Sequence, residues 1–304
     1  MVSKKSSVGQ SGTKNGTRNR AETPDTQAQS LISPEEFFRI CQNGLPKEIA
    51  EAIAKGADIE ARNRTGLPVL TNAIFQNACE VVRVLLEAGA DVEARIKAMP
   101  DEESGLTEGC TPLMFAAIEN SGLEIVQLLL DFGAEVDAEN GGVTALMYAL
   151  FNEADLDVIS ELIERGADVN AKDEDERSVL TFACYAYTGA LPLLLDAGAN
   201  VHYRTSFGTS PLMTCAAYNG HPEAIDILLE AGAELNAQDS AGRTPLICAA
   251  RGNRNPDVLL VLLKAGADAN LTDNKGRRAI DYARENEKFE ETDALQVLER
   301  ASSI

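Results

Sequence analysis

The sequence lacks tryptophan, has only two histidines and contains no long apolar run. Phe and Tyr together make up 5% of the 304 residues. No stretch approaches the roughly 20 apolar residues that span a bilayer, and the basic start of the chain has no apolar run behind it. We therefore expect no membrane contact and no secretory signal, and a cytoplasmic location with reduced thiols. The cysteines are far apart and form no CxxC pair, so with two histidines they predict no zinc site: Cys41, Cys79, Cys110, Cys184, Cys215 and Cys248.

Basic residues are scarce relative to acidic ones. The chain has 27 Lys and Arg against 48 Asp and Glu, which gives a formal net charge of −21. Such a charge repels a phosphate backbone, so we expect no nucleic-acid partner. A basic protein partner would be attracted, but the same charge is also typical of a surface that is simply well solvated. Composition leaves both interpretations open.

An apolar run that ends in Gly-Ala recurs along the chain. Examples are LLEAGADVEA, LLLDFGAEVDA, LIERGADVNA and LLEAGAELNA. The spacings between the successive glycines are 33, 44, 33, 32, 34 and 34 residues, for Gly56, Gly89, Gly133, Gly166, Gly198, Gly232 and Gly266. A period near 33 residues has room for two short helices and a turn, and a repeated period of this kind is typical of a solenoid.

A second marker precedes each run at a constant phase. It reads GCTPLMFAA at 109–117, GTSPLMTCA at 208–216 and GRTPLICAA at 242–250. The Gly permits a tight turn, the Thr or Ser caps the following helix, and Pro suits the first helical position. The small pairs allow close helix packing, and the later Gly-Ala predicts a left-handed cap that ends the second helix. Pro192, inside one second helix, predicts that this helix starts late.

These two phased motifs resemble those of the ankyrin-repeat family over residues 32–304. The resemblance implies an all-α solenoid of helix-turn-helix units joined by β-hairpin loops, with about eight units including the caps. The family's His after T-P-L is absent, so apolar packing must connect neighbouring units here. The predicted units are 32–63, 64–96, 97–139, 140–172, 173–204, 205–238, 239–272 and 273–304.

Two segments depart from the repeat. Residues 1–31 are polar and poor in apolar side chains, so we predict a disordered tail. An insertion at 96–109 explains the spacing of 44 residues and predicts a loop, either functional or a tolerated variation.

The resemblance implies that a partner binds the concave face, which first helices and hairpin tips form. The exposed position after the small pair is large and apolar in four successive units, and this position and the next contribute Phe75, Ile118, Phe151, Tyr185, Tyr218 and Arg251. The position after the lead Gly is apolar in early units and basic later, as at Arg177 and Arg243. These residues predict a groove that binds an apolar segment followed by an acidic one. The alternative is that these side chains only pack across the inner helices.

No constellation of residues predicts catalysis, a cofactor or a metal. Cys215 and His221 are close in sequence, but the first occupies a small, buried helix position and the second a turn. No phosphate-binding glycine loop is present. We therefore predict a monomeric, non-catalytic module that binds another protein. The alternative is a secreted effector that binds and redirects a host-cell protein, for which the N-terminal tail would be the export signal.

Overall fold

The computed structural model describes residues 32–64, 66–97 and 108–303. These residues form sixteen α-helices and no β-strand, which confirms the all-α fold. The predicted disordered tail at 1–31 and most of the insertion at 96–109 lie outside the described residues. The boundaries and the number of the repeat units stay a prediction.

The helices follow one another as antiparallel pairs in chain order. The first helices of the pairs are α1 (Pro34–Asn43), α3 (Val69–Phe75), α5 (Pro112–Ile118), α7 (Ala145–Phe151), α9 (Val179–Ala186), α11 (Pro211–Tyr218), α13 (Pro245–Gly252) and α15 (Ala279–Ala283). The second helices are α2 (Pro46–Ala54), α4 (Cys79–Glu87), α6 (Leu123–Asp131), α8 (Leu156–Glu164), α10 (Leu191–Asp196), α12 (Glu223–Glu230), α14 (Pro256–Lys264) and α16 (Asp293–Ala301).

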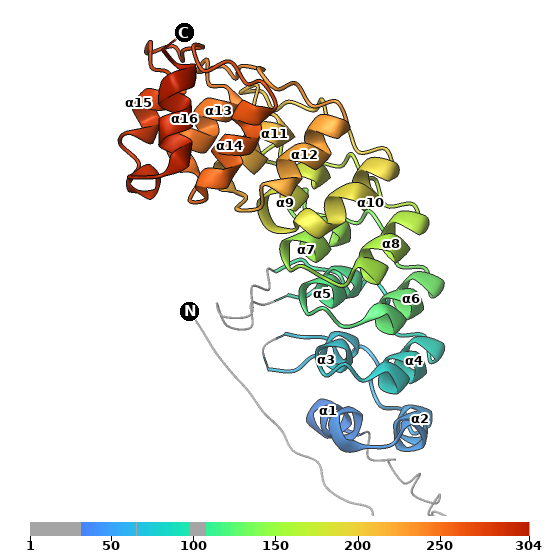
Figure 1. Ribbon diagram of the computed structural model, residues 1–304. Helices are drawn as coiled ribbons and strands as arrows, with labels where there is room; N and C mark the ends of the chain where they lie inside the picture. The colour runs from blue at the N-terminus through green and yellow to red at the C-terminus, as the bar shows by residue number, and fades with distance from the viewer. Residues whose placement is uncertain (1–31, 65, 98–107, 304) are drawn as a thin grey trace, which may run out of the picture. The chain divides into compact units, whose positions relative to one another are not determined.

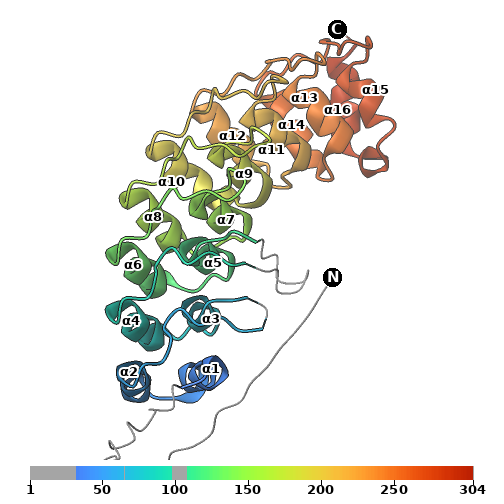
Figure 2. The same ribbon diagram turned by 180° about the vertical axis from the view of Figure 1, so that it is seen from behind.

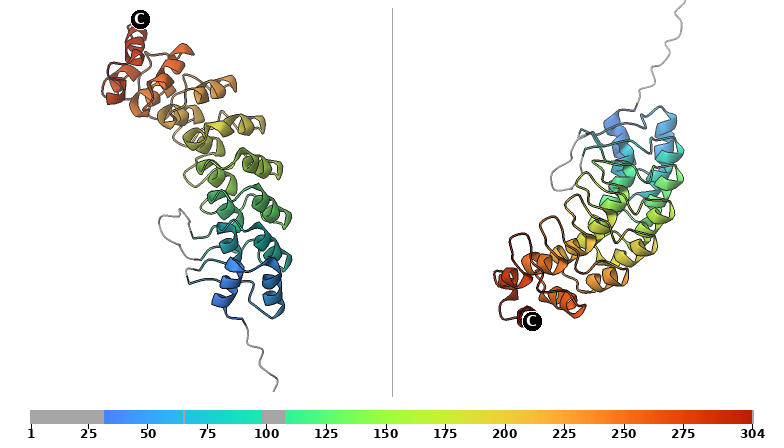
Figure 3. Two further views of the ribbon diagram at one scale, coloured as in Figure 1. Left: turned by 60° about the horizontal axis from the view of Figure 1, so that its bottom comes forward. Right: turned by 90° about the horizontal axis from the view of Figure 1, so that it is seen from above.

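Within residues 32–303 the pairs stack so that first helices form one row and second helices another (Figures 1 and 2). Each first helix contacts the next first helix along the chain, from α1 to α15. The loops between pairs project to one side of the stack (Figure 3). We call the exposed side of the first helices and the adjoining hairpin tips the first-helix face; Phe75, Phe151, Tyr185 and Tyr218 lie on it.

The sequence motifs act where they were predicted to act. Thr111 caps α5, because its hydroxyl accepts a hydrogen bond from the Met114 N–H at 3.3 Å, and the caps of α7, α9, α11 and α13 repeat this contact. Gly133 ends the pair after α6 with a φ of 89°, a left-handed conformation that only glycine adopts cheaply. Five first helices therefore begin at the Thr or Ser cap that the sequence motif supplies.

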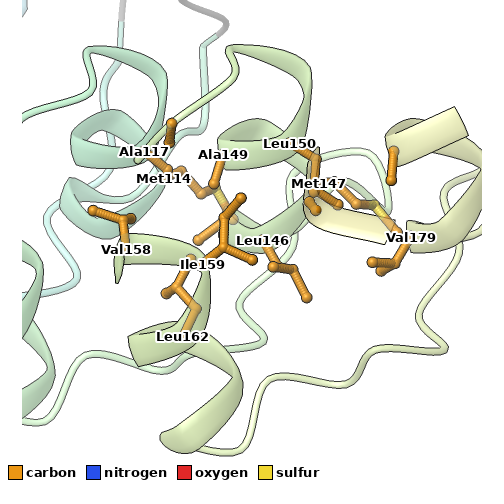
Figure 4. Packing of buried hydrophobic residues seen from close by; sticks show 14 of the residues in the cluster. Met114, Ala117, Leu146, Met147, Ala149, Leu150, Val158, Ile159, Leu162 and Val179 are labelled. Carbon is orange, nitrogen blue, oxygen red and sulfur yellow. The ribbon is translucent and has the colours of Figure 1, made fainter. Parts of the chain in front are cut away.

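The core is a continuous apolar layer between successive pairs. Met114 and Met147, which occupy the position of the family's missing His, are fully buried. Figure 4 shows Met147 near Leu146 and Leu150 on one helix and Val179 on the next. Ala149 and its equivalents leave room for the neighbouring helix, because they are small and fully buried. Apolar packing thus connects the units, as the sequence predicted.

The helix that contains Pro192 starts late, which is also as predicted. A 3-10 turn, η2 (Thr188–Ala190), precedes α10, and Pro192 lies in the first turn of a helix of six residues. Helix α8 contacts η2 at this junction.

The loops between pairs contain isolated β-bridges rather than strands. One such bridge joins Lys172 to Ser178, and another joins Thr272 to Arg278. The two ends of the insertion also meet, since the Ile96 N–H donates to the Cys110 carbonyl at 3.1 Å and the Gly109 N–H donates to the Ile96 carbonyl at 2.9 Å. The described residues at the two ends of the insertion are therefore hydrogen-bonded to each other.

Candidate protein-binding surface

The predicted aromatic positions end successive first helices. Phe75, Phe151 and Tyr185 are each 55% exposed, and Tyr218 is 66% exposed. Ile118 differs, because it is half-buried and packs against the core. The ring of Phe75 lies against the buried Phe115 ring, with centroids 6.3 Å apart. The structure thus shows that four of these five positions face solvent; whether they contact a partner stays a prediction.

Three of these side chains surround one cavity, which we call the aromatic cleft. Its aromatic walls are Phe151, Phe182, Tyr185, Phe207 and Tyr218, and its volume is about 530 Å³. The Tyr185 and Tyr218 rings are in contact, with centroids 5.6 Å apart and planes tilted by 53°. Phe207 comes from a hairpin tip and is 70% exposed. Helices α7, α9 and α11 and the two hairpin tips that carry Arg177 and Phe207 therefore build the cleft together.

The sequence interpretation missed Phe207 although a signal was present. Phe207 immediately precedes the lead Gly208, a position that is polar or small in other units, such as Glu108 and Lys275. A large aromatic side chain at the tip of a loop has no core to enter. An irregular residue in a regular repeat was therefore the available signal.

The predicted basic residues Arg177 and Arg243 are paired within their own hairpin tips. The Arg177 guanidinium contacts the buried Asp173 carboxylate at 2.6 Å and Asp175 at 3.3 Å. It also lies over the Phe182 ring, 5.3 Å from the centroid. Because the carboxylate of Asp173 balances its charge, Arg177 adds little net positive charge to the aromatic cleft.

Arg243 repeats the arrangement one tip further along the stack than the cleft. Its guanidinium contacts the buried Asp239 carboxylate at 2.6 Å, and the backbone N–H groups of Ala241 and Arg243 donate to the same carboxylate. The hydrogen bond to Asp239 raises the pKa of Arg243 above its ordinary value, although burial opposes this shift. The pairing of Asp173 and Asp239 with these arginines was not predicted from the sequence. Because of these pairs, Arg177 and Arg243 help to stabilise their hairpin tips.

A second, larger cavity gathers basic side chains towards the C-terminal end of the first-helix face. We call it the cationic basin; its basic lining residues are Arg243, Arg251, Lys275, Arg277 and Lys288, and its volume is about 780 Å³.

A smaller cavity of about 380 Å³ lies between the aromatic cleft and the cationic basin. It shares Tyr218 with the cleft and Arg243 and Arg251 with the basin. The three cavities therefore follow one another along the first helices from α7 to α15.

The thiols offer no exposed nucleophile. None of the six cysteines, all within the described residues, forms a disulfide. Cys184 and Cys215 are fully buried, and burial together with a hydrogen bond to Cys215 raises the pKa of Cys184. His221 lies exposed in the turn before α12, where its Nδ1 is 3.2 Å from the Glu223 carboxylate. At neutral pH Cys184 therefore stays a protonated, inaccessible thiol.

The described part of the chain contains neither a metal-binding cluster nor a membrane-spanning helix. No group of three His, Cys, Asp or Glu side chains there is arranged to hold a metal ion. No helix there is long and apolar enough to span a membrane.

Comparison with known proteins adds a family assignment. A family model described as ankyrin repeats in three copies matches residues 95–173 and 175–296, which is more than half of the chain. A search among curated proteins finds no match. The matched residues include the aromatic cleft and the cationic basin.

Proposed function

Because the chain belongs to the ankyrin-repeat family, we propose that it is a non-catalytic module that binds an extended segment of another protein along its first-helix face and hairpin tips. Ankyrin repeats are in general protein–protein interaction modules. Fold alone does not assign a function, so the proposal depends on the site.

The observation that carries the proposal is the aromatic cleft. Phe151, Tyr185 and Tyr218 come from three successive first helices and expose large rings around one cavity. Exposed aromatic groups that converge in this way are typical of interaction sites, because their burial against a partner releases water from a large apolar area. Burial contributes about 25 cal/mol for each Å² of apolar surface removed from water.

The lining of the cleft favours an apolar side chain of the partner. Its charged groups, Arg177 and Asp175, contact each other at 3.3 Å. A cation entering the cleft would meet Arg177, and an anion would meet Asp175, so neither charge is favoured there. The remaining polar lining groups are hydroxyls of threonines, such as Thr214, and of Tyr185 and Tyr218, which can bond to the backbone of an extended segment. An aromatic or branched aliphatic anchor fits best.

The direct test is a selection from a displayed library of random dodecapeptides against the purified chain. We expect enriched peptides to share a cluster of aromatic or aliphatic residues. A variant carrying Phe151→Ala, Tyr185→Ala and Tyr218→Ala should bind synthetic copies of these peptides at least about 100-fold more weakly, because interface aromatic anchors contribute about 2 kcal/mol or more each.

The matched control is Phe132→Ala. Phe132 is also an exposed aromatic residue, but it lies at the end of α6 in the row of second helices. Peptide binding should be unchanged in this control, and circular dichroism should show the same fold for all variants. Equal binding by the triple variant, or a selection without apolar enrichment, would contradict the proposed site.

A further inference from the structure

The cationic basin stands out against the charge of the rest of the molecule. The chain carries a net charge of −21, yet five basic side chains and three carboxylates line this cavity. The carboxylates are Asp273, Glu285 and Glu287. Local charge matters here because charges farther away than about 8 Å are largely screened at physiological ionic strength.

Two of the five cations already have partners. Arg243 contacts Asp239 at 2.6 Å, and Arg277 contacts Glu285 at 2.7 Å. The other three, Arg251, Lys275 and Lys288, are exposed and form no ion pair with any described residue: the described ion pairs leave them out. The basin therefore has three cations available to an incoming anion.

Asp273 forms no ion pair with these three cations, although its charge and that of Lys275 attract each other. Its carboxylate is buried, and it accepts hydrogen bonds from the Lys275 and Arg277 N–H groups at 2.9 Å and from the Tyr282 hydroxyl at 2.5 Å. These contacts use its acceptor positions inside the hairpin tip. Only Glu287 stands among the three cations as an exposed, unpaired carboxylate of the lining.

The wall of the basin is fixed before any ligand arrives. The Arg277 guanidinium lies over the Tyr282 ring, 3.9 Å from its centroid, while the Tyr282 hydroxyl bonds to Asp273. The same guanidinium also forms an ion pair with Glu285 at 2.7 Å. A wall that needs no ordering on binding reduces the entropic cost of recognition.

We propose that the cationic basin binds a run of Asp or Glu side chains in the partner, through Arg251, Lys275 and Lys288. The proposal rests on the proposed function, because the acidic run belongs to the segment whose apolar anchor fills the aromatic cleft. The middle cavity, which shares Tyr218 with the cleft and Arg251 with the basin, joins the two. A long nucleic acid would be repelled by the acidic surface beyond the basin, whereas a short acidic run meets the local positive charge.

The test uses a blocked octaglutamate peptide as the probe and an octaglutamine peptide as its neutral counterpart. Both are titrated at physiological ionic strength into the full chain and into a variant carrying Arg251→Ala, Lys275→Ala and Lys288→Ala. We expect the wild type to bind octaglutamate and not octaglutamine. The triple variant should lose about tenfold or more in affinity, and salt should weaken the wild-type complex.

The matched control carries Arg254→Ala and Lys264→Ala. Both residues are exposed cations near α14, and neither lines the basin. This control changes the net charge almost as much but should bind octaglutamate as the wild type does. All replaced side chains are exposed, so the fold should be retained, which circular dichroism checks.

Three outcomes overturn the proposal. The first is that octaglutamate does not bind, and the second is that it binds the wild type, the triple variant and the control with equal affinity. The third is that single-stranded oligouridylate binds the wild type more tightly than octaglutamate does, and that the triple variant loses this binding. None of these results affects the apolar peptides bound by the aromatic cleft, which the Phe151, Tyr185 and Tyr218 variant tests separately. Failure of the basin and failure of the proposed function are therefore distinguishable.

Discussion

The N-terminal and C-terminal parts of the stack connect neighbouring units in different ways. From α11 onward, the turn inside each pair carries an asparagine that donates hydrogen bonds to the preceding units, beginning with Asn219, which donates to the Cys184 carbonyl in α9 at 2.9 Å. The Asn253 Nδ2 group donates to the Ala216 and Asn219 carbonyls, both at 2.8 Å, and Asn286 repeats the pattern one unit later. These side chains form a ladder of hydrogen bonds along the turns.

The corresponding turns before α9 contain no such ladder in the described residues. Asn77, Asn120 and Glu153 adopt a positive φ near 50°, and Asn120 makes one long contact, 3.5 Å, with the Asp155 N–H. Three buried polar groups of this part, including the Thr71 hydroxyl, have no hydrogen-bond partner among the described residues. At these turns apolar layers connect the units without an asparagine ladder, while polar contacts between units lie elsewhere, such as Arg95 donating to the Glu139 carbonyl at 3.0 Å.

The difference coincides with the position of the candidate site. Most of the aromatic cleft and the whole cationic basin lie on the units that the asparagine ladder connects. A surface composed of side chains from several units keeps its geometry only when those units do not shift against one another. The ladder therefore supplies the rigidity that the candidate site requires.

The largest effect is expected from a charge placed in the apolar layer of the N-terminal part. Leu129 in α6 is fully buried, so Leu129→Asp would bury a carboxylate without a partner and should cost at least about 4 kcal/mol. Urea denaturation followed by circular dichroism measures this loss. Leu156→Asp is the control, because Leu156 is exposed at the start of α8; equal losses in both variants would contradict the packing of the layer.

The asparagine ladder predicts the next largest effect. Asn253→Ala removes three hydrogen bonds, two donated to the Ala216 and Asn219 carbonyls and one accepted from the Asn255 N–H, so it should cost about 2 to 3 kcal/mol. Asn120→Gly in the other part should change stability by less than about 0.5 kcal/mol, because glycine readily adopts the positive φ. The two variants are compared by urea denaturation, and similar costs would mean that the two parts do not differ as described.

Two buried hydroxyl groups, one in each part of the stack, should give smaller changes in stability of opposite sign. Thr71→Val removes a buried oxygen that has no partner and should stabilise the chain by about 1 kcal/mol. Thr244→Val removes the cap of α13, whose oxygen accepts from the Ile247 N–H at 3.2 Å, and should destabilise it by about 1 kcal/mol. Thermal melts of both variants give the signs, and a loss in Thr71→Val would show that its hydroxyl has a partner.

The repeat made much of this structure predictable. Helix starts at Thr111, the late start after Pro192 and the exposed Tyr185 follow from local rules that act within one unit. The pairing of Arg177 with Asp173 was missed, because the hydrogen bonds of a tip depend on its folded path rather than on its period. The hydrogen bonds of Asn253 to other units were missed for a related reason: a single sequence shows neither partner of a contact 34 or 37 residues away.

Glu176 provides the smallest expected effect, and it acts on the aromatic cleft. It replaces the lead Gly at the tip after Asp173, with a φ of 61°, and its carboxylate accepts a hydrogen bond from the Ser206 N–H next to Phe207. The backbone hydrogen bond from Ser206 lowers the pKa of Glu176 below its ordinary value of 4.5.

A lowered pKa means that the ionised form favours the folded tip. This contribution is fully present above pH 4.5, and it is lost as the pH falls through the lower folded value. The Ser206 amide resonance should therefore titrate with a midpoint below 4.5, and binding of apolar peptides should weaken over the same range as Phe207 loses its anchor. Glu176→Gln keeps an acceptor oxygen but has no proton to gain. It should therefore abolish the titration of the Ser206 amide resonance and bind peptides at low pH as the wild type does at neutral pH. A midpoint at or above 4.5 would show that Ser206 does not hold the carboxylate, and that the tip bearing Phe207 stands independently of the preceding unit.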